Sequence, residues 1–184
     1  MPLAIGILEL SSIAAGYKAE DGMLKAADVK LLVARTICPG KFIVVIGGNV
    51  SAVQTALKAG EGLAAGFLVD QIFLPNVDPQ LFPALTGSVE PPAAKGKALG
   101  IIETFSSSSI VRAGDAAAKA ANVSLLRVHI AMAVGGKGFL LLSGDVGAAN
   151  AAIKAGIEEI RDAGILVNHV VISNASQELF SDYI

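Results

Sequence analysis

Cys38 is the only cysteine in the 184-residue chain, and a thiolate can act both as a nucleophile and as a metal ligand. Pro39 and Gly40 follow it and are typical of a turn, so we expect an exposed thiol at a bend between two strands. A cysteine followed by a proline also ends the ligand run of bacterial ferredoxins. One thiolate cannot hold an iron–sulfur cluster, but symmetry can bring several chains together. The alternative is a small apolar core residue.

The two histidines, His129 and His169, are the next candidates for metal binding or proton transfer. They fall in the second and fourth expected strands of the second half of the chain. In a ferredoxin-like sheet these strands lie at opposite edges, which argues against a shared metal site. Their counterparts in the first half are Arg35 and Gln71, so no histidine site is duplicated. We therefore expect both histidines to have surface or structural roles.

The remaining polar candidates do not form a catalytic set. Glu9 and Glu103 hold equivalent places in two copies, so we expect capping or helix-linking roles rather than an acid–base pair. The serine run 106–109 resembles a helix start and has no histidine at a spacing that would activate a nucleophile. Gly47-Gly48 and Gly135–Gly138 do not match the phosphate-binding loop, and the second cluster predicts a hairpin between strands. We expect a protein that is not an enzyme.

The chain contains an internal duplication that must position these residues. The segment Ala4–Glu9 returns as Ala98–Glu103, 94 residues later, and Lys58–Gly60 returns as Lys154–Gly156, 96 residues later. A period of this length indicates a duplicated domain. The first change of offset falls in the loop that holds Cys38, where the second copy has Met132 or Ala133. The predicted organisation is a first domain at residues 1–86, a linker at 87–97 and a second domain at 98–184.

Each copy reads strand, helix, strand, strand, helix, strand, followed by a short closing helix, expected at 79–85 in the first copy. This β-α-β-β-α-β order predicts an α/β (α+β) fold with two tandem ferredoxin-like domains. Ser11 and Ser12 are the expected cap candidates for the first helix of the first copy, and Asn49 or Ser51 is expected to begin its second helix. Its first helix is expected to carry Ile13, Tyr17, Leu24 and Ala27 at turn-like spacing.

The composition favours an assembled protein. Hydrophobic residues make up 53% and charged residues 16% of the chain, with a mean hydropathy of +0.64. This is apolar for a soluble domain, and it favours an exterior that is itself buried against other subunits. A net charge of −2 does not indicate a basic surface for nucleic acid. No apolar run is long enough to span a membrane. With a single cysteine and no leader-like segment, we expect a cytoplasmic location.

The repeated motifs resemble bacterial microcompartment shell proteins of the tandem-domain, trimer-forming class. The resemblance rests on Ala-Ile-Gly-Ile-Leu-Glu and Ala-Leu-Gly-Ile-Ile-Glu at the two copy starts, and on the repeated Lys-Ala-Ala and Lys-Ala-Gly. It covers nearly the whole chain. It implies that three chains form a flat pseudohexagonal tile in a compartment shell, with other shell proteins as neighbours and enclosed redox enzymes as further partners.

The resemblance also implies roles for particular residues. In a member of this class from propanediol-utilization compartments, the cysteine that matches Cys38 holds one [4Fe-4S] cluster per trimer on the threefold axis. Ile37, Pro39 and Gly40 would then line the central opening, while Lys25 and Lys119 would lie at the tile edges. Many members carry Pro-Arg-Pro-His after the fourth strand, and neither copy has that edge arginine, so lattice contacts are expected to differ.

Three functions follow from these observations. The leading hypothesis is a structural shell protein with an electron-transfer cluster at Cys38. The first alternative is a shell protein whose unmetallated opening passes small metabolites. The second alternative is a soluble ferredoxin-like enzyme or regulator, against which stand the missing catalytic set and the apolar composition.

Overall fold

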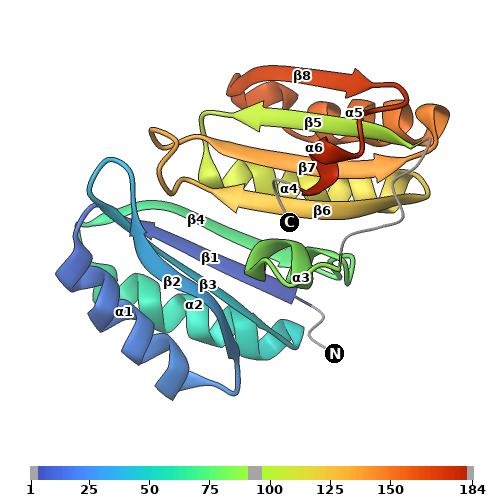
Figure 1. Ribbon diagram of the computed structural model, residues 1–184. Coiled ribbons are helices and arrows are strands. Elements are labelled where there is room, and N and C mark those ends of the chain that lie inside the picture. Colours follow the sequence, from blue (N-terminus) through green and yellow to red (C-terminus); the bar gives the residue numbers. More distant parts are fainter. Residues whose placement is uncertain (1–3, 91–96, 182–184) are drawn as a thin grey trace. The chain divides into compact units, whose positions relative to one another are not determined.

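The computed structural model describes residues 4–90 and 97–181, which fall into two compact units that divide between Pro79 and Gln80. The first unit contains, in chain order, β1 (Ala4–Leu10), α1 (Ile13–Ala26), β2 (Lys30–Ile37), β3 (Lys41–Gly48), α2 (Val50–Ala64) and β4 (Leu68–Pro75). Its strands lie in the order β2-β3-β1-β4, and every neighbouring pair is antiparallel (Figure 1). The expected ferredoxin-like arrangement is confirmed.

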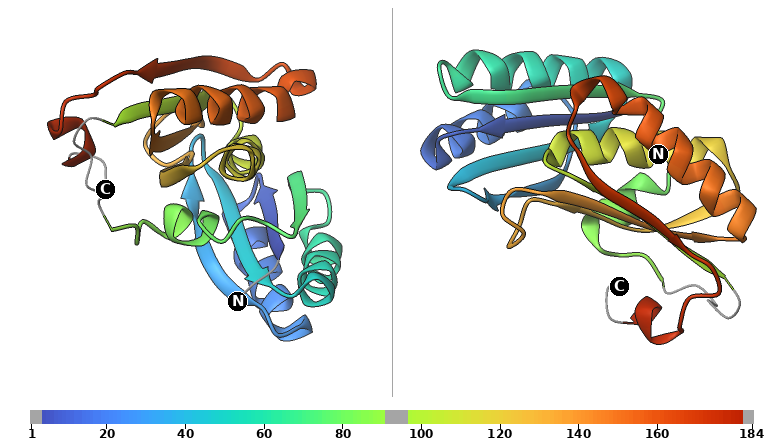
Figure 2. Two further views of the ribbon diagram at one scale, coloured as in Figure 1. Left: turned by 90° about the vertical axis from the view of Figure 1, so that its right-hand side faces the viewer. Right: turned by 90° about the horizontal axis from the view of Figure 1, so that it is seen from above.

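The second unit repeats this arrangement and adds short helices. Its elements are α3 (Leu81–Thr86), β5 (Ala98–Thr104), α4 (Ser107–Ala120), β6 (Val123–Ile130), β7 (Gly138–Gly144), α5 (Val146–Glu159), a 3₁₀ turn (Arg161–Ala163), β8 (Leu166–Ile172) and α6 (Glu178–Ser181). The strand order is β6-β7-β5-β8, again antiparallel throughout. Figure 2 shows α4 and α5 together on one face of this sheet. The fold predicted for the second copy is thus also confirmed.

Helix α3 is where the structure differs from the sequence repeat. It was expected to close the first copy, but it packs on the second unit. The Gln80 side chain donates to the Val123 carbonyl over 3.2 Å and accepts from the Leu125 amide over 3.0 Å, and so satisfies edge groups of β6. The predicted limits 1–86 and 98–184 follow the repeat rather than this packing. Residues 91–96 of the predicted linker lie outside the described residues.

The helix starts agree with the capping residues read from the sequence. Ser12 accepts from the Ala15 amide, Asn49 from the Ala52 amide and Ser106 from the Ser109 amide. Each side-chain oxygen satisfies an amide that has no partner within its helix. The three helix starts are therefore fixed locally.

The apolar residues that recur along α1 do not mark its buried side. Ile13, Tyr17 and Leu24 are 40, 62 and 39% exposed. The residues that α1 buries are Gly16, Ala19 and Met23, of which Gly16 lies against Phe42 of β3 and Met23 lies near Gly60 of α2. Close approach of helix and sheet selects small residues at the contact, and the larger apolar residues are left on the outer side.

The two copies fill one core position from opposite sides. In the first unit, Gly16 of α1 lies against Phe42 of β3, and a Cβ on Gly16 would come within 2.4 Å of that ring. The equivalent residues of the second unit are Ile110 and Gly138, and there the Ile110 side chain lies 2.6 Å from the place of a Gly138 Cβ. The bulky side chain comes from the strand in one copy and from the helix in the other. Packing is thus conserved in volume while residue identity is exchanged.

Candidate functional site

Cys38 lies in a short hairpin of the first unit. Cys38, Pro39 and Gly40 connect β2 to β3, and the strands close the turn by pairing Ile37 with Lys41. Gly40 has a φ of +73°, a backbone conformation that glycine adopts without a steric penalty. Pro39 and Gly40 are exposed, and Cys38 is a half-buried free thiol. The expected turn at Cys38 is confirmed, but the thiol is half-buried rather than exposed.

Ile37 differs from the other residues predicted to line an opening. It is the last residue of β2 and is only 4% exposed. It therefore anchors the hairpin in the core, while Pro39 and Gly40 form the solvent-exposed part of the turn. Which of these residues line an opening between chains stays a prediction.

An ion pair lies at the base of the hairpin. Lys41 Nζ donates to Glu9 Oε1 over 2.6 Å, and the side chains are 31% and 8% exposed. The second unit has the same arrangement, with Lys137 donating to Glu103 over 2.8 Å. The predicted capping or helix-linking role of both glutamates is therefore wrong. They connect the central strand of each sheet to the end of its hairpin.

The second hairpin is longer and has no thiol. Residues 131–137 connect β6 to β7, and Gly135 and Gly136 have φ values of +65° and +85°. His129 packs beneath this loop: its ring stacks on Phe139 at 4.8 Å, and its Nε2–H donates to the Met132 carbonyl over 2.7 Å. The predictions of a glycine hairpin and of a structural His129 are confirmed.

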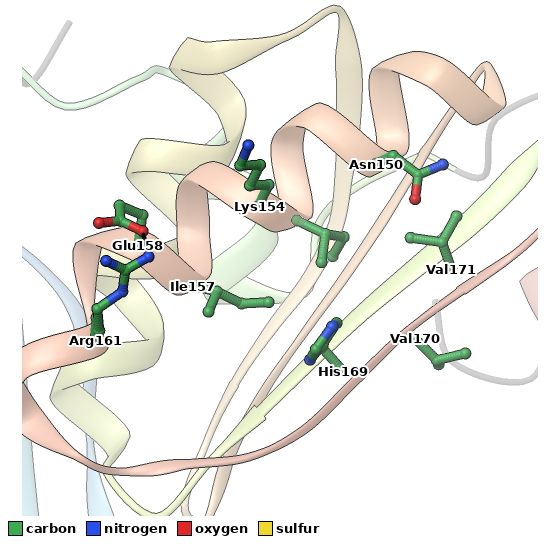
Figure 3. A pocket seen from close by; sticks show the side chains of 9 residues that line it. Asn150, Lys154, Ile157, Glu158, Arg161, His169, Val170 and Val171 are labelled. Carbon is green, nitrogen blue, oxygen red and sulfur yellow. Dashed lines mark ion pairs between the residues drawn. The ribbon is translucent and has the colours of Figure 1, made fainter.

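His169 lies at the other edge of the same sheet, on β8, as expected from the strand order. It lines an open groove of about 610 Å³ between β8 and α5. Figure 3 shows its side chain near Ile157. Glu158 and Arg161 form an ion pair at one end of this groove. Across residues 4–90 and 97–181, no group of three His, Cys, Asp or Glu side chains comes together to hold a metal ion.

The predicted edge lysines occupy equivalent places, in the last turns of α1 and α4. Lys25 pairs with Asp21 over 2.6 Å, and Lys119 pairs with Asp115 over the same distance. The lysine side chains are 74% and 44% exposed. Sequence reasoning missed these partners, although both aspartates are part of the repeat. The location of the lysines at a tile edge stays a prediction.

The outer sheet faces, away from the long helices, are covered to different extents in the two copies. In the first unit, Ile5, Ile7, Ile43 and Val45 are at most 1% exposed. Their counterparts in the second unit are Leu99, Ile101, Phe139 and Leu141, and two of these, Ile101 and Phe139, are only partly buried. An apolar hollow of about 340 Å³ lies over this second face. The second unit thus has an incompletely covered apolar surface.

Glu103, at the border of this hollow, is 33% exposed and keeps its ion pair with Lys137. The surface is otherwise aliphatic and aromatic, without a group suited to proton transfer among its described lining residues. It is suited to burial against another apolar surface rather than to chemistry. No helix among the described residues is long and apolar enough to cross a membrane.

Comparison with known proteins gives consistent results across the chain. The BMC domain family matches residues 4–77 and 98–175. Bacterial microcompartment shell protein PduT of Citrobacter freundii is 46% identical over 182 residues, covering 98% of this chain and 97% of that protein. Carboxysome shell protein CcmK2 of Synechococcus elongatus is 40% identical over 60 residues, covering 33% of this chain and 59% of that protein.

A solved structure is similar over the same extent. The crystal structure of a microcompartment protein from Desulfitobacterium hafniense DCB matches with a TM-score of 0.93 and 44% identity. The match covers 97% of this chain and 98% of that chain. The duplication read from the sequence therefore corresponds to two BMC domains in tandem.

Proposed function

The chain belongs to the BMC domain family, as a bacterial microcompartment shell protein with two such domains in tandem, and on this basis we propose how it acts in the shell. Three copies form a flat pseudohexagonal tile, and Cys38 of each copy binds one shared [4Fe-4S] cluster on the threefold axis. The expected resemblance to propanediol-utilization shell protein T is confirmed by the 46% identity with PduT. Beyond this family membership, the trimer and its cluster are our proposal.

The incompletely covered apolar face of the second unit supports the trimer. Apolar surfaces of this kind are buried when copies assemble, and a ring closes when each copy meets the next through the same pair of surfaces. The partly buried Ile101 and Phe139 lie on such a surface, and their first-unit counterparts Ile7 and Ile43 are buried. A second copy of the chain would cover this apolar face.

The observation that carries the cluster proposal is a single free thiol on an exposed hairpin. Cys38 is half-buried and is followed by the exposed Pro39 and Gly40, so its thiol lies where a ligand shared with other chains could reach it. One chain cannot supply a cluster site by itself, because a [4Fe-4S] cluster needs several thiolates. Three chains around one axis would supply three. When bound, the cluster would supply one-electron transfer across the shell.

A tile with an open, metal-free passage for small metabolites is the second candidate. It is favoured by the ligand count, because three chains offer three thiolates to a cluster with four irons. Catalysis has less support, since the similar proteins reported above are named as shell proteins. The proposed partners are other shell proteins, with enclosed redox enzymes as electron partners.

The two candidates are separated by iron and sulfide content after anaerobic reconstitution. Cys38→Ser should lose the iron and the visible absorbance and keep the trimer mass, because the subunit contacts do not depend on the metal. Met132→Ser is the matched control, since Met132 lies in the corresponding hairpin of the second unit and is 43% exposed. It should keep both iron and mass. Iron retained by Cys38→Ser, or wild-type protein without iron, would exclude the cluster.

A further inference from the structure

The two hairpins of the chain share their base and differ in their tip. In each unit a lysine–glutamate pair joins the end of the hairpin to the central strand: Lys41, the first residue of β3, pairs with Glu9, and Lys137, the residue before β7, pairs with Glu103. The tips between the strands are residues 38–40 in one unit and 131–137 in the other. Two copies that diverged in the tip have thus kept the same ion pair. This retained pair suggests a role in how the hairpin is held.

The pair in the first unit is the more buried of the two. The Glu9 side chain is 8% exposed, whereas that of Glu103 is 33% exposed. Glu9 lies on β1 between two strands, opposite Ile43 of β3 and Asp70 of β4. Its carboxylate is therefore fixed by the centre of the sheet, and it offers Lys41 a rigid acceptor. Charge-assisted hydrogen bonds of this kind are the shorter and stronger ones.

Lys41 connects this fixed carboxylate to the thiol. It is the first residue of β3, and its ladder partner is Ile37, the residue before Cys38. Ile37 is buried, so both ends of the three-residue turn are anchored: one by burial and the other by the ion pair. The turn itself is exposed and has few contacts of its own; a side chain at Gly40 would have no heavy atom within 4 Å.

We infer that Glu9 and Lys41 are positioning residues for the Cys38 thiol. The ion pair holds the end of β3 against β1, and this fixes the direction in which the turn presents the thiol. The inference rests on the proposed function, because a site shared by three chains requires three thiols held in the same direction. It concerns the single chain, however, and it can be tested on metal-free protein.

The test measures how fast Cys38 reacts in folded, metal-free trimer with a neutral dipyridyl disulfide, which forms a mixed disulfide and releases one thiopyridone. Because the chain has one cysteine, the signal comes from this site alone. Glu9→Gln and Lys41→Met should each raise the rate by about three- to tenfold, since a looser base lets the thiol sample open conformations. Lys41→Arg should restore a rate near wild type. Glu103→Gln is the matched control and should leave the rate unchanged.

The direction in which the reaction rate changes distinguishes a positioning role from an electrostatic effect of these charges on the Cys38 thiolate. If Lys41 acted only through its charge, Glu9→Gln would raise thiolate reactivity and Lys41→Met would lower it. Opposite signs, unchanged rates, or an equal increase in Glu103→Gln would each overturn the inference. Should Glu9→Gln not fold, Lys41→Met and Lys41→Arg decide alone. Failure of the wild type to bind iron would refute the cluster and leave this result valid.

Discussion

The exchanged core position gives a sharp test of the packing. Gly16 and Phe42 of the first unit correspond to Ile110 and Gly138 of the second, so the pair Gly–Phe is replaced by Ile–Gly. Placing the residue pair of the second unit at the equivalent positions of the first unit requires Gly16→Ile together with Phe42→Gly. We expect each single variant to be strongly destabilised and the double variant to recover much of the loss.

The magnitudes follow from the contacts. A Cβ at residue 16 would lie 2.4, 2.5 and 2.7 Å from atoms of Phe42, which is 1% exposed and has no room to move. Gly16→Ile should therefore cost about 3 kcal/mol, at the upper end of overpacking. Phe42→Gly should cost about 4–6 kcal/mol, from the cavity and from a glycine within a strand. Independent effects would add to roughly 7–9 kcal/mol, which exceeds the stability of many domains.

The double variant should cost no more than about 3 kcal/mol, because Ile refills most of the space that Phe leaves. Thermal unfolding followed by circular dichroism at one protein concentration and one scan rate gives the ranking, since both variables shift the midpoint of an oligomer. Gly62→Ala on the exposed side of α2 is the control; a Cβ there meets no atom within 4 Å, and the midpoint should rise slightly. A double variant less stable than Phe42→Gly alone would refute the reasoning.

Three further predictions concern single features. Replacing Lys25 and Lys119 together by Ala should leave trimers intact in light scattering and abolish extended sheets in electron micrographs; unchanged sheets would contradict an edge role. Burial, and secondarily the nearby Asp21, raise the pKa of Glu20 in the folded protein. The group therefore stabilises the folded state below its unfolded pKa. It loses this contribution as the pH rises through its higher folded pKa. Glu20→Gln should thus raise the unfolding midpoint at pH 7 and not at pH 4, and an equal rise at both would be inconsistent. Gln80→Ala should lower stability by about 1–2 kcal/mol in urea unfolding, because two hydrogen bonds to β6 are lost; no change would mean that water replaces them.

The sequence predicts the fold because the signals are local and occur twice. Ser12, Asn49 and Ser106 cap their helices through bonds to residues three positions ahead, and such bonds depend on neighbours in the chain alone. The turn at Cys38 is equally local. Reading each element in two copies also removed much of the ambiguity between strands and helices.

The errors concern contacts between distant segments. Glu9 pairs with Lys41 because β1 and β3 are neighbours in one register, which no local pattern reveals. The buried side of α1 does not follow from its apolar spacing because Gly16 and Ala19 make the close contact, so the larger apolar residues that dominate a periodicity lie outside. Similarly, α3 follows the first copy in sequence and packs on the second unit, where the Gln80 side chain forms a hydrogen bond with the backbone of the edge strand β6.

Native mass spectrometry of anaerobically reconstituted protein tests the central claim most directly, because it reports the number of chains and the bound metal in one spectrum. The account predicts a single species of three chains with the added mass of one Fe₄S₄ unit, and the same trimer without that mass for Cys38→Ser. A stable monomer, or a wild-type trimer that carries no iron after reconstitution, would contradict it.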